Sequence, residues 1–507
     1  MSISPILPAR YQASRLLGEG ATGSVYLAMD TELGIEVALK VVHANLALHR
    51  RFRARFAREV ALSSQVVHRC VIPVHDFGRQ EDGRPFVSLA YARRGSLAEL
   101  LGARSQGSSG TSLDSFVRIV DQVLDALGCL HARGLLHQDL KPGNVLLHGD
   151  EGTPFDVWVA DLGVAGALSE LTMNPRGIAG TPHWMAPEQL MCRPQELGPW
   201  TDLYPVGLLL YEALGAPPSD TVNGRVKQLA GICSGKAPVP QGTSRAIWEV
   251  VSCLLHPDPR QRYDRAADAR RALAQALEKK PVEGTVTGLS EGGRSTHLSV
   301  VDLNDVSARS TRGMAPWKPC EESAVPRWNQ LPRATLPVEP ERESAADYPA
   351  SLKVTVMRQP PLVVREGLRR QLWSQARDVV RSGEPRVVLL CGASGSGKTR
   401  TVESVVQALE QGGYMESAFL RYHDPMGSYD GYRGVLFELL SPWQDERSQV
   451  ESRLARWLAR DRSRTPEQMR SEAAVLTRWC GYLRTDEKPV NGAVGLAYLY
   501  RHMAARA

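Results

Sequence analysis

The chain has 507 residues, of which 43% are hydrophobic and 23% are charged. These fractions are typical of globular proteins and exclude a chain dominated by disorder, while the length predicts more than one domain. The formal net charge is only +6, and the basic residues are spread along helices rather than interleaved with aromatic residues in one stripe, so we expect no nucleic acid partner.

The cysteines and the first residues bear on the cellular compartment. The eight cysteines stand singly, without a CxxC pair, so the sequence predicts neither a zinc site nor a disulfide framework. The start, MSISPILPARYQ, lacks the cationic and apolar regions of a signal peptide, and no run of about 18 apolar residues occurs. We therefore expect a cytoplasmic protein without a membrane span.

Composition divides the chain into two structured blocks and a separator. After an N-terminal tail of residues 1–10, apolar runs alternate with turn signals over residues 11–279. Residues 280–350 are rich in Pro, Gly, Ser and Thr, and their apolar runs are too short for a core, so a flexible linker is predicted. Residues 351–507 return to helical and strand periodicity.

The first block begins with a glycine-rich segment, LLGEGATGSVYLAM, between two predicted strands. Gly18, Gly20 and Gly23 have G-x-G-x-x-G spacing, and Val25 follows them. Glycines let a backbone approach phosphate oxygens without a Cβ in the way. A hairpin with a glycine-rich turn would have the same sequence, so this motif alone leaves both interpretations open.

A lysine and a glutamate follow the glycines at suitable intervals. Lys40 lies in the alternating strand EVALKVV, from which its ammonium group can reach phosphates beneath the glycine loop. Glu59 lies in the predicted helix RFRARFAREVALSSQ, where it can pair with Lys40. A surface acid on a charged helix is the usual interpretation of such a glutamate, and only its place after Lys40 and the glycines favours the pair.

The segment HQDLKPGN and a later aspartate predict phosphoryl transfer. Asp139, Lys141 and Asn144 have D-x-K-x-x-N spacing, and Asp161 ends the predicted strand VWVAD. Asp139 can orient a hydroxyl or accept its proton, and Lys141 can reach the transferring phosphoryl group. Asn144 and Asp161 offer the oxygen ligands that Mg²⁺ prefers. Singly, each residue could be a turn or cap, but the combined spacing favours the catalytic interpretation.

Over nearly all of residues 11–277, these motifs in this order resemble the protein kinase family. HQDLKPGN is similar to its catalytic loop, DLG at 161–163 to its metal-binding triplet, and GTPHWMAPE to the end of its activation segment. The resemblance implies a bilobal α+β fold that binds ATP and Mg²⁺. Lys141 and Thr181 imply the serine/threonine branch, so we expect transfer of the γ-phosphate to Ser and Thr of protein substrates, autophosphorylation included.

The resemblance also assigns supporting residues. The segment PFVSLAYARRGSL is similar to the strand and hinge that contact adenine, with Leu89 at the entrance to the back pocket and Ala92 in the hinge. Ala38 is placed in the same nucleotide site. His137 is expected to be a buried structural residue behind the metal-binding triplet, since a lone histidine is more often structural than catalytic.

Two pairs of residues are expected to support the larger lobe. Asp202, in TDLYPVGLLLYEALG, resembles the aspartate that holds the catalytic loop by hydrogen bonds. Glu188 is expected to pair with Arg262, because buried charges need partners.

Three positions depart from the family pattern. Gln138 stands where most kinases have an arginine that pairs with a phosphate on the activation segment, so control by phosphorylation at Ser169, Thr172 or Thr181 is in doubt. Leu162 replaces the commoner phenylalanine and is apolar enough to pack in its place. Pro205 lies within the predicted lower-lobe helix, where it forces a kink unless it is near the first turn.

The second block contains VVLLCGASGSGKTRTVESVV, a predicted strand, glycine-rich loop and helix. Gly392, Gly397, Lys398 and Thr399 match the P-loop, whose amides bind phosphates while the lysine reaches the β and γ oxygens and the threonine binds Mg²⁺. A plain glycine-rich turn is less favoured because the flanking elements fit. The preceding PLVVREGLRRQL resembles the start of signalling ATPases of the AAA/STAND type. We find no later strand ending in the acidic residue that hydrolysis needs, so an incomplete module is expected.

Taken together, the motifs predict a bacterial-type serine/threonine protein kinase joined by a linker to a partial α/β P-loop NTPase domain. The alternative is a nucleotide-gated signalling scaffold whose kinase fold binds nucleotide without catalysis. Retention of Lys40, Asp139, Asn144 and Asp161 argues against that alternative. A third hypothesis makes the P-loop half the principal enzyme, and the missing acidic strand disfavours it.

Overall fold

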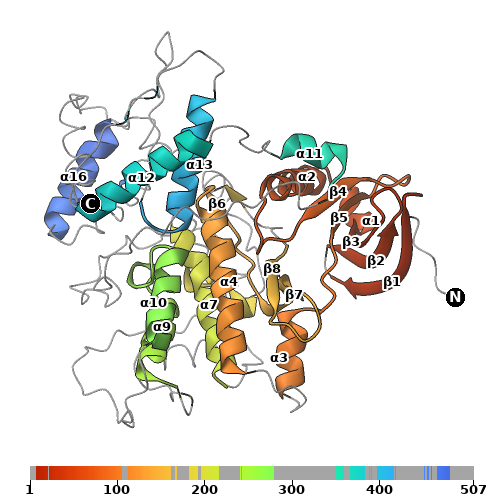
Figure 1. The fold of residues 1–507 in the computed structure, drawn as a ribbon, viewed down its shortest axis with the longest axis horizontal. Helices are drawn as coiled ribbons and strands as arrows, with labels where there is room; N and C mark the ends of the chain where they lie inside the picture. The colour runs from red at the N-terminus through yellow and green to blue at the C-terminus, as the bar shows by residue number, and fades with distance from the viewer. Residues whose placement is uncertain are drawn as a thin grey trace, which may run out of the picture.

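The fold comes from a computed structural model of the chain. The structure describes residues 7–20, 22–105, 112–161, 166–167, 182–191, 196–215, 240, 243–278, 349–358, 366–382, 388, 390, 397–415, 417, 450–451, 454–455, 458 and 465–479. In Figure 1 the first block forms a smaller lobe built on a sheet and a larger, helical lobe, and helices of the second block lie against both. The bilobal α+β architecture predicted for the first block is confirmed.

The smaller lobe is built on a five-stranded antiparallel sheet with the order β1-β2-β3-β5-β4. Its strands are β1 (Tyr11–Glu19), β2 (Gly23–Asp30), β3 (Ile35–Val42), β4 (Val74–Arg79) and β5 (Pro85–Ala90). Successive side chains of a strand point to opposite faces, and β3 buries Val37, Leu39 and Val41 in one cluster. Helix α2 (Arg50–Gln65) supplies Phe56 and Val60 to a separate cluster with β4 and β5.

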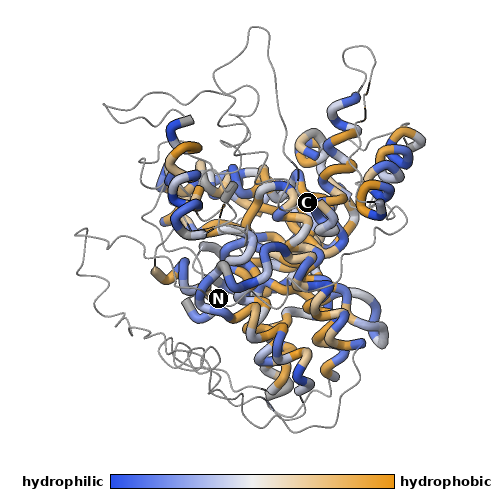
Figure 2. Tube along the Cα trace, turned by 90° about the vertical axis from the view of Figure 1, so that its left-hand side faces the viewer, coloured by the Kyte–Doolittle hydropathy of each residue, from blue (hydrophilic) through white to orange (hydrophobic). Residues whose placement is uncertain are grey.

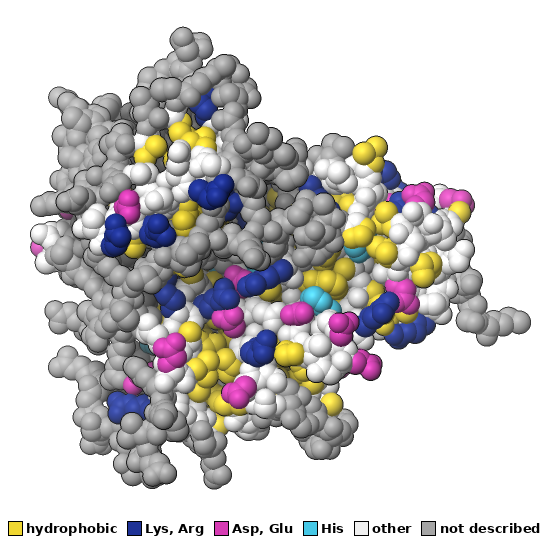
Figure 3. All heavy atoms as spheres, viewed as in Figure 1, with side chains coloured by type: hydrophobic (Ala, Val, Ile, Leu, Met, Phe, Trp, Pro, Cys, Tyr) yellow, Lys and Arg dark blue, Asp and Glu magenta, His cyan; other side chains and the backbone are white. Residues whose placement is uncertain are grey.

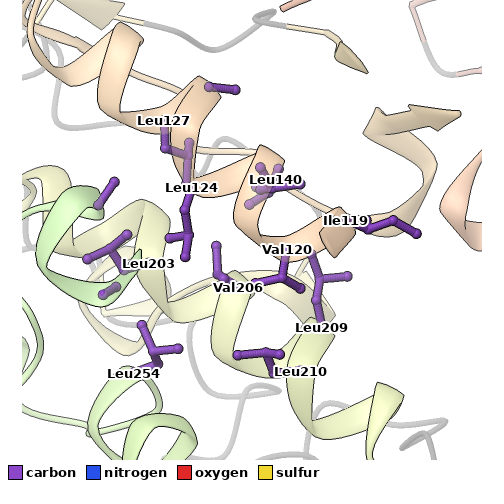
Figure 4. Packing of buried hydrophobic residues seen from close by; sticks show 14 of the residues in the cluster. Ile119, Val120, Leu124, Leu127, Leu140, Leu203, Val206, Leu209, Leu210 and Leu254 are labelled. Atoms are coloured by element: carbon purple, nitrogen blue, oxygen red, sulfur yellow. The ribbon is translucent and has the colours of Figure 1, made fainter. Parts of the chain in front are cut away.

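The larger lobe surrounds two long helices. These are α4 (Leu113–His131), which begins where the Ser112 hydroxyl accepts the Ser115 N–H, and α7 (Pro199–Ala213). Figure 4 shows Leu124 and Leu127 of α4 near Leu203 of α7 in one buried cluster. The helices α9 (Arg245–Leu254) and α10 (Ala266–Glu278) pack against this pair, and α3 (Leu97–Ser105) lies closer to the sheet (Figure 1).

Short paired strands lie at the junction of the lobes. They are β6 (Leu135–Leu136), β7 (Val145–His148), β8 (Asp156–Val159) and β9 (Gly166–Ala167), with the 3-10 turn η1 (Pro142–Asn144) before β7. Strand β7 pairs antiparallel with β8, and β6 pairs antiparallel with β9. The loops that join these pairs carry the residues predicted to be catalytic.

The second block contributes helices that reach the first. They are α11 (Leu352–Met357), α12 (Glu366–Ser382), α13 (Lys398–Gln411) and α16 (Pro466–Trp479). Trp373 of α12 packs against Val405 and Leu409 of α13. Helix α11 contacts β4 and α2, and α13 contacts α4. Most of the predicted linker lies outside the described residues.

The helices are amphipathic, and the described surface mixes charges of both signs. Figure 2 shows hydrophobic and hydrophilic positions alternating along the helices, as amphipathic packing requires. On the described part of the face in Figure 3, acidic and basic side chains are interspersed, so charge of one sign is not gathered in a single patch there. Among the described helices, none combines the length and the apolar character needed to cross a membrane. Pro205 lies inside α7, beyond its first turn.

Candidate active site

The glycine-rich segment is the turn between β1 and β2. The Gly20 N–H donates to the Gly23 carbonyl at 2.9 Å and closes the turn. A Cβ on Gly23 would lie 2.2 Å from the Val41 carbonyl oxygen, so a side chain is excluded there by packing. A Cβ on Gly18 would meet no heavy atom within 4 Å in the described structure. Open space beside the backbone at Gly18 fits the predicted approach of phosphates.

Lys40 lies beneath this turn and forms an ion pair across the lobes. It is paired with Val25 in the register of β2 and β3, and its Nζ lies 2.5 Å from Asp161 Oδ1. Burial disfavours the charged lysine, but Asp161, followed by Glu59 and Asp139, raises the pKa of Lys40 above its ordinary value. The direct pairing with Glu59 stays a prediction, while the ion pair with Asp161 is observed.

The catalytic-loop residues meet as their spacing predicts. Lys141 Nζ donates to Asp139 Oδ2 at 2.7 Å. The Asn144 side chain donates through Nδ2 to the Asp139 carbonyl at 2.8 Å and to Oδ2 at 3.4 Å. These bonds fix the direction of the Asp139 carboxylate, and they leave the amide oxygen of Asn144 as the atom that can bind a cation.

The hairpin of β7 and β8 brings Asn144 beside Asp161. Val145 is paired with Val159, and the Ala160 N–H donates to the Asn144 carbonyl at 2.8 Å. Burial favours the neutral acid, but the charge and hydrogen bond of Lys40 hold the pKa of Asp161 below its ordinary value. An ionised carboxylate and an amide oxygen suit Mg²⁺, which takes its other ligands from water and phosphates.

Strained backbone occurs at two residues of the site. Gln138 and Asp161 have φ of 63° and 59°, and they are the non-glycine residues with positive φ in the described chain. Such conformations are costly and gather at functional sites, where the surroundings hold them. Here Asp202 holds the loop, because its carboxylate accepts the N–H groups of His137 and Gln138, each at 2.8 Å. The predicted role of Asp202 is confirmed.

Asp202 is itself held by a histidine. His131 Nε2 lies 2.8 Å from Asp202 Oδ2. Burial disfavours the carboxylate, yet the hydrogen bond from His131 helps to keep the pKa of Asp202 below its ordinary value. His131 is not among the residues predicted from the sequence. The signal that could have identified it is a polar residue at the end of a long amphipathic helix, shortly before the catalytic loop.

His137 has the structural role that the sequence predicts. It is fully buried, its Nε2 lies 3.0 Å from the Ala160 carbonyl, and its Nδ1 accepts the Asp139 N–H at 3.3 Å. With Nε2 donating and Nδ1 accepting, the ring fits the neutral tautomer. It therefore links the catalytic loop to the residue before Asp161.

The predicted adenine-binding residues lie at the edge of the junction. Ala38 of β3 is paired with Leu89 of β5, and Ala92 follows the end of β5 and is buried. Small and apolar side chains near Lys40 would accommodate the face of an adenine ring. Their contact with nucleotide stays a prediction.

Gln138 stands where most kinases have an arginine, and its surroundings enclose it almost completely. Gln138 is buried, and its carbonyl accepts from Gln189 Nε2 at 2.8 Å. Its own Nε2 is buried without a hydrogen-bond partner among the described residues. Leu162 and the candidate phosphorylation sites lie outside the described residues; those sites are Ser169, Thr172 and Thr181.

The pair predicted to stabilise the larger lobe is confirmed. Arg262 donates to both carboxylate oxygens of Glu188, at 2.8 and 2.9 Å. Thr201 donates its hydroxyl to the same carboxylate at 3.0 Å. The two ions are almost fully buried and bidentate, the geometry that best satisfies a buried pair.

Part of the predicted P-loop is described. Gly397 precedes α13 with φ of 78°, a conformation that favours glycine. Lys398 and Thr399 lie in the first turn of the helix, the end at which a helix can bind phosphate. Gly392 lies outside the described residues. The nucleotide contacts of this segment stay predictions.

Comparison with known families matches both blocks. Residues 11–277 match the model of the protein kinase domain, and residues 361–490 match that of an AAA ATPase domain. The match to the second model agrees with the AAA-type resemblance of the P-loop segment.

Individual relatives cover the first block. The chain is 36% identical to serine/threonine-protein kinase pkn3 of Myxococcus xanthus, over 54% of this chain and 50% of that protein. It is 35% identical to the DNA damage-responsive serine/threonine-protein kinase RqkA of Deinococcus radiodurans, over 58% of this chain and 44% of that protein. The chain thus spans about half the length of these curated relatives. A crystal structure of the Mycobacterium tuberculosis PknI kinase domain aligns with 54% of this chain and 100% of that one, at 24% identity and a TM-score of 0.41.

Proposed function

This chain belongs to the protein kinase family, whose model matches more than half of it, and we propose that it transfers the γ-phosphate of ATP to serine or threonine hydroxyls of proteins. The observation that carries the proposal is the ion pair between Lys40 and Asp161, which joins the lobes beside Asp139. The names of the relatives, all serine/threonine-protein kinases, favour that class of hydroxyl.

The residues of the site divide the tasks of this reaction among them. Asp139, directed by Lys141 and Asn144, orients the acceptor hydroxyl and receives its proton. Lys141 is close enough to Asp139 to contact the transferring phosphoryl group as well. Lys40 places a positive charge at the nucleotide phosphates, and its raised pKa keeps it charged.

Asn144 and Asp161 would hold Mg²⁺, which supplies charge neutralisation at the phosphates when bound. The ionised state of Asp161 supports this assignment, as does the bonding of the Asn144 amide to Asp139 through its nitrogen and not its oxygen. The glycine turn would cover the phosphates from the opposite side.

The first test is mass spectrometry of the purified full chain incubated with Mg²⁺ and ATP, alone and with a generic acceptor protein. We expect new phosphate on serine or threonine of the chain or the acceptor, and none when EDTA replaces Mg²⁺. A chain that binds ATP but yields no phosphate on either protein would instead support the nucleotide-gated scaffold. The map of modified residues would also show whether the segment containing Ser169, Thr172 and Thr181 is a substrate despite Gln138.

We also propose that Gly397, Lys398 and Thr399 bind a second nucleotide whose presence tunes the kinase. Lys398 and Thr399 begin helix α13, and the C-terminal end of α13 lies against the larger lobe, which supports this coupling. The Gln411 amide is 2.9 Å from His68 Nε2, and a Cβ on Gly128 of α4 would lie 3.1 Å from the Gln411 carbonyl. Helix α13 thus connects the P-loop to the kinase.

Replacing Lys398 by alanine is expected to lower the nucleotide stoichiometry of the full chain and to change its phosphorylation rate. The reason is that the lysine neutralises the β and γ phosphates in a P-loop. Equilibrium dialysis with labelled ATP and a phosphorylation assay measure the two effects. Arg470→Ala, which removes an exposed charge from α16, is the control. If both variants match the wild type in stoichiometry and rate, coupling through the P-loop is wrong.

A further inference from the structure

A short segment that begins with the last two residues of the predicted linker is docked on the smaller lobe. We call residues 349–358, which include α11, the strap. Figure 1 shows α11 lying beside α2 at the outer side of the lobe, and contacts join α11 to both α2 and β4. Val354 is fully buried in a cluster with Phe56 and Val60 of α2 and Val74 of β4. The strap therefore completes an apolar cluster of the kinase.

Hydrogen bonds fasten both ends of the strap to β4. At its start, the Ser351 N–H donates to the His75 carbonyl at 2.7 Å, and His75 Nδ1 lies 2.5 Å from the Pro349 carbonyl. At its end, Arg358 Nη2 donates to the Val74 carbonyl at 2.9 Å. Two of these bonds run to backbone carbonyls of β4, and the third joins the His75 ring to the backbone of the strap, so together they fix the register of the strap along β4.

The Asp76 carboxylate of β4 links the strap to the beginning of β1. The Ser351 hydroxyl donates to Asp76 Oδ1 at 2.6 Å. The other oxygen of Asp76 accepts from Arg10 at 3.0 Å and from the Tyr11 hydroxyl at 3.2 Å. Asp76 thus joins the strap, β4 and the beginning of β1 in one polar cluster.

The strap buries one side of its helix and exposes the other. Val354 is 0% exposed, whereas Leu352, in the same helix, is 80% exposed. Among the described side chains of the strap, Val354 is the fully buried apolar anchor, Ala350 packs partly buried against the same cluster, and hydrogen bonds to β4 aid both. An anchor of this size suffices because the linker keeps the strap near its site, which makes docking intramolecular.

Val354 of the strap packs against α2, the helix that carries Glu59. Phe56 and Val60 of α2 contact the cluster of the strap, and Glu59 lies between them in the sequence of the same helix. A helix packed in this way moves as a unit, since cores are close-packed. The position of α2 against the strap therefore sets the position of Glu59 relative to Lys40.

We propose that the strap is an intramolecular docking segment that positions α2, and through it Glu59 and Lys40, for ATP. Kinase activity then depends on a segment that lies outside the block with the kinase motifs. This inference rests on the proposed kinase activity. The strap residues touch neither substrate nor nucleotide and act as positioning residues.

The test compares Val354→Asp with Leu352→Asp in the full chain. A carboxylate at the buried position must leave the apolar cluster, because an unpaired buried charge is strongly disfavoured, whereas the exposed position accepts it. We expect Val354→Asp to raise the KM for ATP by about tenfold, since misplaced binding groups weaken positioning. Hydrogen exchange of the α2 amides should become faster, while exchange in α4 should not change. Leu352→Asp and the conservative Val354→Ile should behave as wild type.

The outcomes separate the inference from the proposed function. If Val354→Asp speeds exchange in α2 but leaves KM and kcat unchanged, the strap docks without positioning the nucleotide and the proposal is overturned. It is overturned as well if neither exchange nor kinetics respond. If exchange responds as expected but the wild-type chain itself phosphorylates nothing, the proposed kinase activity is what fails, and the docking of the strap stands.

Discussion

Replacing Asp139 by asparagine is expected to lower the rate of phosphoryl transfer by about 10² to 10⁴-fold, the range that a positioned acid or base contributes. Asparagine preserves the shape of the side chain but cannot receive the hydroxyl proton. It also loses the charge that Lys141 Nζ contacts at 2.7 Å. The nucleotide site, formed by Lys40 and Asp161, is not altered directly.

Single-turnover phosphorylation together with an ATP binding curve measures this prediction. We expect kcat to fall while the dissociation constant for ATP stays within about twofold, since the lost interaction belongs to the transition state. Asp150→Asn makes the same chemical change at an exposed residue and should leave both quantities unchanged. A fall of less than tenfold in Asp139→Asn would show that Asp139 is not the residue that orients or deprotonates the hydroxyl.

Contacts between residues that are close in the sequence were the most predictable part of the candidate site. D-x-K-x-x-N places Asp139, Lys141 and Asn144 on one tight loop whose own turn brings them together. The hairpin that follows returns the chain beside Asn144, so Asp161 could be foreseen from the strand before it. In such cases local geometry decides the contact, and the sequence is enough.

Contacts between distant segments were less accessible. The strap docks through Val354, Ala350 and a few hydrogen bonds, and a helix as short as α11 gives too little periodicity for its buried face to be recognised. Its partners on β4 are far away in the sequence, since His75 and Pro349 are 274 residues apart. His131 was missed for a similar reason, because its bond to Asp202 depends on how α4 and α7 pack. The left-handed backbone of Gln138 has no sequence signal, since glutamine does not favour that conformation.

Breaking the buried ion pair between Glu188 and Arg262 is expected to have a large effect on stability. Replacing Glu188 by glutamine is expected to destabilise the larger lobe by about 3 to 5 kcal/mol, because it leaves the buried guanidinium of Arg262 without a countercharge. Hydrogen exchange of the α7 amides, which pack beside this pair, reports the free energy of local opening. Glu36→Gln removes one partner of the exposed pair with Arg93 and is expected to change stability by less than about 1 kcal/mol.

Burial is the reason that the two pairs differ so much. Arg262 and Glu188 are 0% and 1% exposed, whereas Arg93 and Glu36 are 76% and 38% exposed. Water can replace the lost partner of Arg93 but cannot reach Arg262. The double variant Glu188→Gln with Arg262→Met removes the buried charge as well, and it should recover part of the stability. Recovery stays partial because Arg262 also donates to the His256 carbonyl at 2.7 Å, and the double variant loses this hydrogen bond. Equal destabilisation by Glu188→Gln and Glu36→Gln would mean that the buried charge is solvated or neutralised in some other way.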